Sequence, residues 1–276
     1  MREEDAGGLD ARSRRLRARV VAVLRSSRRG HVGAAFSAIE ILRVLFDDIL
    51  RYDPMNPGWP ERDRFILSKG HGCLALYVLL AEKGFFPVEE LSRFCVPGGI
   101  LGGHPDARKI PGVETSTGSL GHGLSFGVGM ALHARMTGAA HRVFVVLGDG
   151  ECDEGSVWEA ALSAGKHGLD PLTVVVDYNK MQSYGTVDEV QTLEPFLDKW
   201  RSFGFAACEC DGHDVGALRA VFGGMPLVAG KPSVVLCHTV KGKGSPLTEH
   251  NLAWHHKSKI SDEELASLEA SFGGGA

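Results

Sequence analysis

The sequence lacks several features that would assign the chain to a class at once. Its 276 residues carry 30 basic and 34 acidic side chains, so no basic excess favours nucleic-acid binding. Its six cysteines form no Cys-x-x-Cys pair, so neither a zinc site nor a disulfide framework is indicated. No apolar run reaches the length of a membrane span, and the N-terminus has no secretory signal. We therefore expect a cytoplasmic protein that binds neither nucleic acid nor a membrane.

What the sequence does contain is an alternation of β-rich and helical segments. This alternation predicts an α/β fold with a mostly parallel central sheet and helices on both faces. We expect a flexible leader at residues 1–8, one domain at residues 9–272 and a flexible tail at residues 273–276.

The first two helices are predicted from their capping residues. Asp10 is expected to cap an arginine-rich helix, and Ser37 is expected to cap the next one. We interpret the arginines as a solvated helix face rather than as a nucleic-acid surface or a transit signal.

We interpret most of the chain as a scaffold for one stretch, which runs from Gly148 to Met181. An unbroken apolar run at residues 143–147 predicts a strand buried on both faces, and Asp149 follows its end. A helical segment and a second β-rich run at residues 172–176 then lead to Asn179. The right-handed crossover of such a βαβ unit places Asp149 and Asn179 at one edge of the sheet.

Asp149 and Asn179 indicate a metal site that a ligand must complete. One carboxylate and one amide oxygen suit Mg²⁺, or Ca²⁺ as a substitute, when phosphate oxygens and a backbone carbonyl supply the other ligands. Gly148 and Gly150 allow a phosphate to approach the backbone closely. The stretch therefore predicts a bound diphosphate.

Two other motifs are set aside. Residues 241–245 read Lys-Gly-Lys-Gly-Ser, but they lack the upstream glycine of a nucleotide-binding P-loop and open no clear helix. His250, His255 and His256 have no acidic or cysteine ligand nearby at a convincing spacing for zinc.

Gly-Asp-Gly followed at this distance by Asn resembles the thiamine diphosphate motif, and the surrounding sequence resembles transketolase. Five further motifs occur in the order that transketolases show. They are Gly-His-Val-Gly with His31, Lys-Gly-His-Gly with His71, Gly-His-Pro-Asp with His104, Gly-Ser-Leu-Gly-His-Gly from Gly118, and Trp-His with His255. The match runs over roughly residues 10–270 and covers only the diphosphate-binding half of transketolase.

The resemblance implies a role for each matching residue. His31, His104 and His255 would act catalytically on the sugar. The implied metal ligands are Asp149, Asn179 and the carbonyl of Met181. The implied cofactor-binding residues are His71, Gly118, Ser119, Leu120, Asp149, Gly150, Glu154 and Asn179. The sequence departs from the family pattern at Val32, His122 and His256.

The resemblance also implies that the chain works with a partner. In transketolases the glutamate that hydrogen-bonds the cofactor's pyrimidine ring, and the usual sugar-phosphate arginines, belong to the other half. The simplest hypothesis is the N-terminal subunit of a split transketolase in an α2β2 heterotetramer, transferring a two-carbon ketol unit between sugars or sugar phosphates. The alternatives are a subunit of another thiamine diphosphate enzyme, of 2-oxo acid dehydrogenase or deoxyxylulose phosphate synthase type, a noncatalytic homologue, and a simple Mg²⁺-diphosphate-binding module.

Overall fold

The computed structural model describes residues 8–273 of the chain. Residues 1–7 and 274–276, which make up most of the expected leader and tail, lie outside the described residues. Between residues 8 and 273, no helix is both long and apolar enough to cross a membrane.

Within residues 8–273, five strands form one parallel sheet in the order β1-β2-β3-β5-β4. The strands are β1 Arg64–Leu67, β2 Val143–Gly148, β3 Leu172–Tyr178, β4 Ala206–Asp211 and β5 Ser233–His238. Every residue of β2 and β3 is buried. The predicted parallel sheet is therefore confirmed, and so is the prediction that its central strands show no alternation because both faces are covered.

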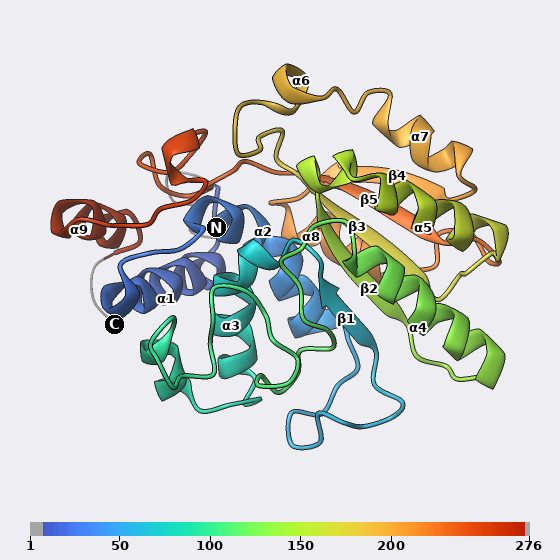
Figure 1. Ribbon diagram of the computed structural model, residues 1–276, viewed down its shortest axis with the longest axis horizontal. Helices are drawn as coiled ribbons and strands as arrows, with labels where there is room; N and C mark the ends of the chain where they lie inside the picture. Colours follow the sequence, from blue (N-terminus) through green and yellow to red (C-terminus); the bar gives the residue numbers. More distant parts are fainter. Residues whose placement is uncertain (1–7, 274–276) are drawn as a thin grey trace.

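Helices cover both faces of the sheet (Figure 1). The apolar cluster on one face contains residues of α1 Ala11–Ser27, α2 Val32–Val44, α3 Cys73–Glu82, α8 Val215–Gly223 and α9 Asp262–Ser271, with α1 packed on α2 and α3 and α9 packed on α1. The other face packs against α4 Gly123–Thr137, α5 Gly155–Lys166 and α7 Phe196–Ser202. The shorter elements are η1 Leu45–Ile49, η2 Gly70–Gly72, η3 Val88–Arg93, η4 Gly150–Asp153, α6 Val187–Val190 and η5 Leu252–Trp254.

The start of the first helix is confirmed, whereas the predicted start of the second is wrong. Asp10 accepts a hydrogen bond from the backbone N–H of Ser13 and caps α1. α2 begins after His31, so Ser37 lies inside that helix, where it is fully buried. The Ser37 hydroxyl instead donates to Asp177 on β3 at 2.6 Å, a tertiary contact that the local sequence does not reveal.

Candidate active site

The βαβ unit from β2 to β3 brings the predicted ligands together. Gly148 pairs with Asp177 in the strand register, so Asp149 and Asn179 both follow strand ends at one edge of the sheet. Asp149 is 2% exposed, and its carboxylate accepts from the N–H groups of Gly150 and Lys180. The crossover geometry expected from the sequence is therefore present.

A cavity of about 240 Å³ opens at this edge and collects most of the predicted site. Ten of the predicted residues line it: His31, His71, His104, Gly118, Leu120, Asp149, Gly150, Asn179, Met181 and His255. Ser119 and Glu154 do not, and both are exposed.

The Met181 carbonyl, the third predicted metal ligand, already contacts the cationic side chain of Lys241. The carbonyl of Met181 accepts a hydrogen bond from the ammonium of Lys241 at 2.7 Å. The amide oxygen of Asn179 accepts from the N–H of Met181 at 3.1 Å, which fixes the turn that carries both residues. An ordered loop thus presents two of the three predicted ligands, with Lys241 beside them.

Two charged side chains that line the cavity, Asp149 and Lys241, have shifted pKa values. Burial and the nearby Asp177 carboxylate raise the pKa of Asp149 to about 6. Burial and the neighbouring Lys69 lower the pKa of Lys241 to about 8, although Asp149 and Asp177 oppose that shift. A divalent cation beside Asp149 would favour its ionised form, as a metal site requires.

Asp177 forms a buried ion pair with Lys69, which lines this cavity. Asp177 is fully buried, and it accepts hydrogen bonds from Lys69, Ser37 and Thr239. Burial opposes ionisation of Asp177, but the charge and hydrogen bond of Lys69 outweigh it and lower the pKa. Asp177 therefore ties β3 to α2 and to the segment that follows β5.

Four of the histidines gather around His31. The ring centroid of His31 lies 5.4 Å from that of His71, 6.1 Å from His104, 5.8 Å from His255 and 4.7 Å from His256. All but His256 were predicted from the sequence. His256, named as a departure from the family pattern, stacks on His31 and belongs to the same cluster.

Burial lowers the pKa values of three of the clustered imidazoles, those of His31, His71 and His255. Burial lowers the pKa of His31 to about 4 and that of His255 to about 3, and nearby positive groups add to both shifts. The pKa of His71 lies well below its usual value for the same reason. His31 Nδ1 lies 2.8 Å from the backbone carbonyl of His255, which can only accept, so Nδ1 carries the proton. Nε2 of His31 is then the acceptor that it can offer to a ligand.

A second cavity of about 330 Å³ adjoins the first across these histidines. His31, His71 and His104 line both cavities, and His256, Cys95 and Arg29 line only the second. No carboxylate among the described residues lines this second cavity. Arg29 is exposed, and its guanidinium makes no ion pair or hydrogen bond within the described part of the chain.

Two glycines allow the cavity wall to form. Gly118 has φ +133°, and a Cβ there would lie 2.7 Å from the His104 ring. A Cβ at Gly150 would lie 2.9 Å from the Cβ of Gln182. Each glycine therefore permits a close approach that a side chain would prevent.

Five other residues that line the first cavity are not predicted from the sequence. They are Lys69, Glu151, Gln182, Ser183 and Lys241. Two of them lay inside motifs that had been noticed, because Lys69 precedes Gly-His-Gly and Lys241 begins the rejected P-loop-like segment. Glu151 is buried and accepts from Ser68 and from the N–H groups of Gly121 and Gly148. Glu151 directly follows Gly-Asp-Gly, a position that could have identified it, whereas the resemblance implies Glu154.

The parallel sheet, with oxygen donors and two lysines lining a cavity at its carboxyl edge, defines an α/β protein whose cavity suits a charged ligand. The chain matches the family described as "Transketolase, thiamine diphosphate binding domain" over residues 11–275. It belongs to the transketolase family and corresponds to the N-terminal, diphosphate-binding half.

Several named proteins are similar to this chain. It is 46% identical to the 6-deoxy-6-sulfo-D-fructose transketolase subunit SqwG of Clostridium sp. (strain MSTE9), over 85% of each chain. It is 40% identical to an apulose-4-phosphate transketolase subunit of Phocaeicola vulgatus, over 90% of this chain and 88% of that one.

Solved transketolases show the same fold. The enzyme from Leishmania mexicana superposes with a TM-score of 0.87 at 30% identity, over 95% of this chain and 41% of its own. A variant from Pichia stipitis gives a TM-score of 0.89 at 30% identity, over 96% of this chain and 40% of its own. The chain thus spans about two fifths of these transketolases. The recognition of a thiamine diphosphate-binding fold and of a transketolase-type transferase with subunit-named homologues is confirmed.

Proposed function

We propose that this chain is the diphosphate-binding subunit of a two-component transketolase that uses thiamine diphosphate and Mg²⁺, with Ca²⁺ as a substitute. One observation carries the proposal: a single edge of the sheet joins an oxygen-donor cavity to a cluster of histidines. The first part suits a charged diphosphate, and the second suits the hydroxyl groups of a sugar.

The residues present fit the proposed cofactor and metal. Asp149, Asn179 and the Met181 carbonyl offer three hard oxygen donors, which leave sites that diphosphate oxygens would fill. The described residues contain no group of three or more His, Cys, Asp or Glu that would hold a metal by themselves. A metal at this edge would therefore depend on the diphosphate, while Lys241 and His71 would bind the phosphate groups.

Within this proposal the chain orients the substrate rather than supplying the central chemistry. Thiamine diphosphate supplies, when bound, the nucleophilic carbon that two-carbon transfer requires. The fixed tautomer of His31 leaves Nε2 to accept from a sugar hydroxyl. His255 Nε2 is 3.0 Å from the Ser183 hydroxyl, which orients that ring, while His104 lies on the wall between the two cavities.

We further propose that the partner is a transketolase subunit that binds the pyrimidine end of the cofactor, and that the assembly is an α2β2 heterotetramer. Relatives that are named transketolase subunits, and that the chain matches along most of their length, support a separate partner. We place the assembly in the cytoplasm, because all six cysteines carry free thiols, as is usual in a reducing compartment.

Replacement of Asp149 tests the metal and cofactor site. Asp149→Ala should abolish Mg²⁺-dependent binding of thiamine diphosphate, because the removed carboxylate is the one charged ligand in the proposed set. Isothermal titration calorimetry would measure the binding, and circular dichroism would check that the fold is retained. A folded variant that binds the cofactor with unchanged affinity would remove Asp149 from the site.

We also propose that the sugar carries an anionic group. Arg29 supports this, because it lines the second cavity without an ion-pair partner among the described residues. The names of the two relatives specify a sulfonated ketose and a phosphorylated sugar, whose anionic groups a guanidinium recognises well.

Replacing Arg29 tests this substrate class. Arg29→Gln should raise KM for phosphorylated or sulfonated substrates about 10- to 100-fold, since a charged hydrogen bond is worth about 1.5–3 kcal/mol. The KM for glycolaldehyde, a neutral acceptor, should stay unchanged. Arg28→Gln is the control, because Arg28 pairs with Asp262 at 2.7 Å. Equal effects on charged and neutral acceptors would contradict this role for Arg29.

A further inference from the structure

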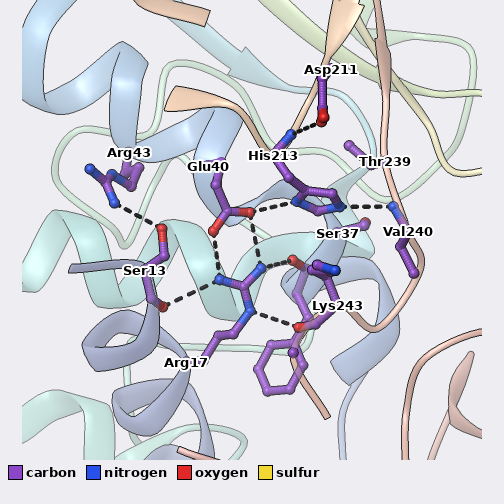
Figure 2. A network of polar contacts seen from close by, with 12 residues as sticks. Ser13, Arg17, Ser37, Glu40, Arg43, Asp211, His213, Thr239, Val240 and Lys243 are labelled. Carbon is purple, nitrogen blue, oxygen red and sulfur yellow. Dashed lines mark hydrogen bonds and ion pairs between the residues drawn. The ribbon is translucent and has the colours of Figure 1, made fainter. Parts of the chain in front are cut away.

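A buried polar network joins α1, α2 and the loop before α8 (Figure 2), and its three central residues, Arg17, Glu40 and His213, do not line the 240 Å³ cavity. Its centre is an ion pair between Arg17 on α1 and Glu40 on α2, with N–O distances of 2.6 and 2.9 Å. Both side chains are at most 1% exposed. Burying two charges is costly, so a pair of this kind needs further hydrogen bonds to be stable.

The hydrogen bonds of Arg17 reach the segment that follows β5. Its Nε donates to the carbonyl of Lys243 at 2.7 Å, and its Nη2 donates to the carbonyl of Phe36 at 2.8 Å. The guanidinium also donates to the carbonyl of Ser13. Arg17 therefore fixes the backbone at Lys243, two residues after Lys241.

His213 makes the second connection to this segment. It lies between β4 and α8, and its Nδ1 is 2.8 Å from the Glu40 carboxylate. Its Nε2 is 2.8 Å from the backbone nitrogen of Val240. Because the N–H of Val240 can only donate, Nε2 must be the unprotonated acceptor, and Nδ1–H then donates to Glu40. His213 thus joins the buried carboxylate to the residue directly before Lys241.

Lys241 lies between the two anchored positions and reaches into the cavity. It is 2% exposed, and its ammonium donates to the carbonyl of Met181. Two residues before Lys241, the hydroxyl of Thr239 donates to Asp177. Directly after Lys241, the N–H of Gly242 donates to the carbonyl of Gly33. The segment is therefore held on both sides of the residue whose ammonium enters the site.

We propose that the Arg17–Glu40–His213 network positions Lys241 for the diphosphate, with His213 as a positioning residue that acts through the N–H of Val240. This inference rests on the proposed function. It assigns a role to three residues that touch neither the cavity nor the predicted metal ligands. The network comes from α1, α2 and the loop before α8, so it couples elements remote in sequence to one cofactor contact.

Two substitutions at His213 separate positioning from folding. His213→Asn keeps an N–H near the place of Nδ1 for Glu40, but it is too short to reach Val240. His213→Gln is long enough to accept from the Val240 N–H. We expect Asn to weaken binding of Mg²⁺-thiamine diphosphate about 10- to 100-fold, as losses of supporting contacts often do, and Gln to restore most of it.

A double-mutant cycle tests whether the effect passes through Lys241. Lys241→Met should weaken cofactor binding, and adding His213→Asn to it should weaken binding no further. Calorimetry with Mg²⁺ and thiamine diphosphate provides the affinities, and denaturant unfolding provides the stability of each variant. His133→Asn, at an exposed position on α4, is the matched control and should bind like the parent chain.

The outcomes distinguish this inference from the proposed function. If the complex of the parent chain with its partner subunit shows no Mg²⁺-dependent binding of thiamine diphosphate, the proposed function fails and the inference fails with it. If the parent binds and folded His213→Asn binds equally well, only the positioning role is overturned. Additive losses in the double variant, or no recovery with Gln, would also overturn it.

Discussion

At the scale of single residues, the site combines a raised carboxyl pKa with lowered imidazole pKa values. Burial acts on all of these groups, and it disfavours whichever form carries the charge. Asp149 is driven toward its protonated form, whereas His31 and His255 are driven toward their neutral forms. The chain alone therefore presents a cavity whose charge a metal and a diphosphate would complete.

The histidines predict how the stability of the isolated chain depends on pH. An unfolded histidine has a pKa near 6.5, whereas His31 and His255 in the fold have values of about 4 and about 3. As pH falls below about 6.5, the unfolded state binds protons that the folded state does not, so the free energy of unfolding should decrease. Asp149 works in the opposite direction, because its folded pKa is raised to about 6.

Denaturant unfolding at pH 7 and pH 5 would check this prediction. His31→Gln and His255→Gln should each lose less stability between the two pH values than the parent chain does. His133→Gln, at an exposed site, should behave like the parent. If the two active-site variants show the parent's full pH dependence, the assigned pKa shifts are wrong.

The sequence predicted the residues with a recognisable neighbourhood and missed those placed by tertiary contacts. Asp149 and Asn179 follow strand ends, so local pattern was sufficient for them. His31, His71, His104 and His255 were predicted from ordered motifs that resemble those of transketolase. Serine is a residue type that often caps helices, which favoured that interpretation of Ser37. Its actual partner, Asp177, lies 140 positions away in the sequence. Lys241 was overlooked because its motif suggested a different phosphate-binding loop, which the structure does not form.

At the scale of elements, α4 shows how glycines serve packing in one place and are dispensable in another. Gly127 faces β2, and a Cβ there would lie 2.5 Å from Cγ2 of Val145. Gly129 is exposed on the same helix, and a Cβ there would meet nothing within 4 Å. The sequence showed four glycines in or near this helix but could not show which of them approach a neighbour.

This contrast predicts opposite effects for one substitution at two positions. Gly127→Ala should destabilise the chain by about 1–3 kcal/mol, because the stiff, buried Val145 cannot move aside without strain. Gly129→Ala should stabilise it by up to about 1 kcal/mol, because alanine is the better helix former. Chemical denaturation of both variants would measure the difference, and similar effects at the two positions would contradict the packing of α4 on β2.

At the scale of the whole molecule, residues 8–273 form one parallel sheet with an apolar cluster on each face, and the chain matches part of each solved transketolase. The alternation of apolar segments was enough to predict the parallel sheet, since each central strand is buried on both faces. The chain corresponds to about 40% of the solved transketolases that it matches. The diphosphate end of the cofactor and the clustered histidines belong to this chain in our account, and the pyrimidine end belongs to a partner.

The most direct test of this account is ketol transfer by the chain with and without its partner. The purified chain, supplied with Mg²⁺, thiamine diphosphate, a ketose donor and an aldose acceptor, should show little or no transfer. Adding a purified pyrimidine-binding subunit encoded beside it should restore transfer, with both subunits in one complex on size-exclusion chromatography. Full activity of the isolated chain, at a level that the partner does not raise, would contradict the central claim that the active site is completed between two polypeptides.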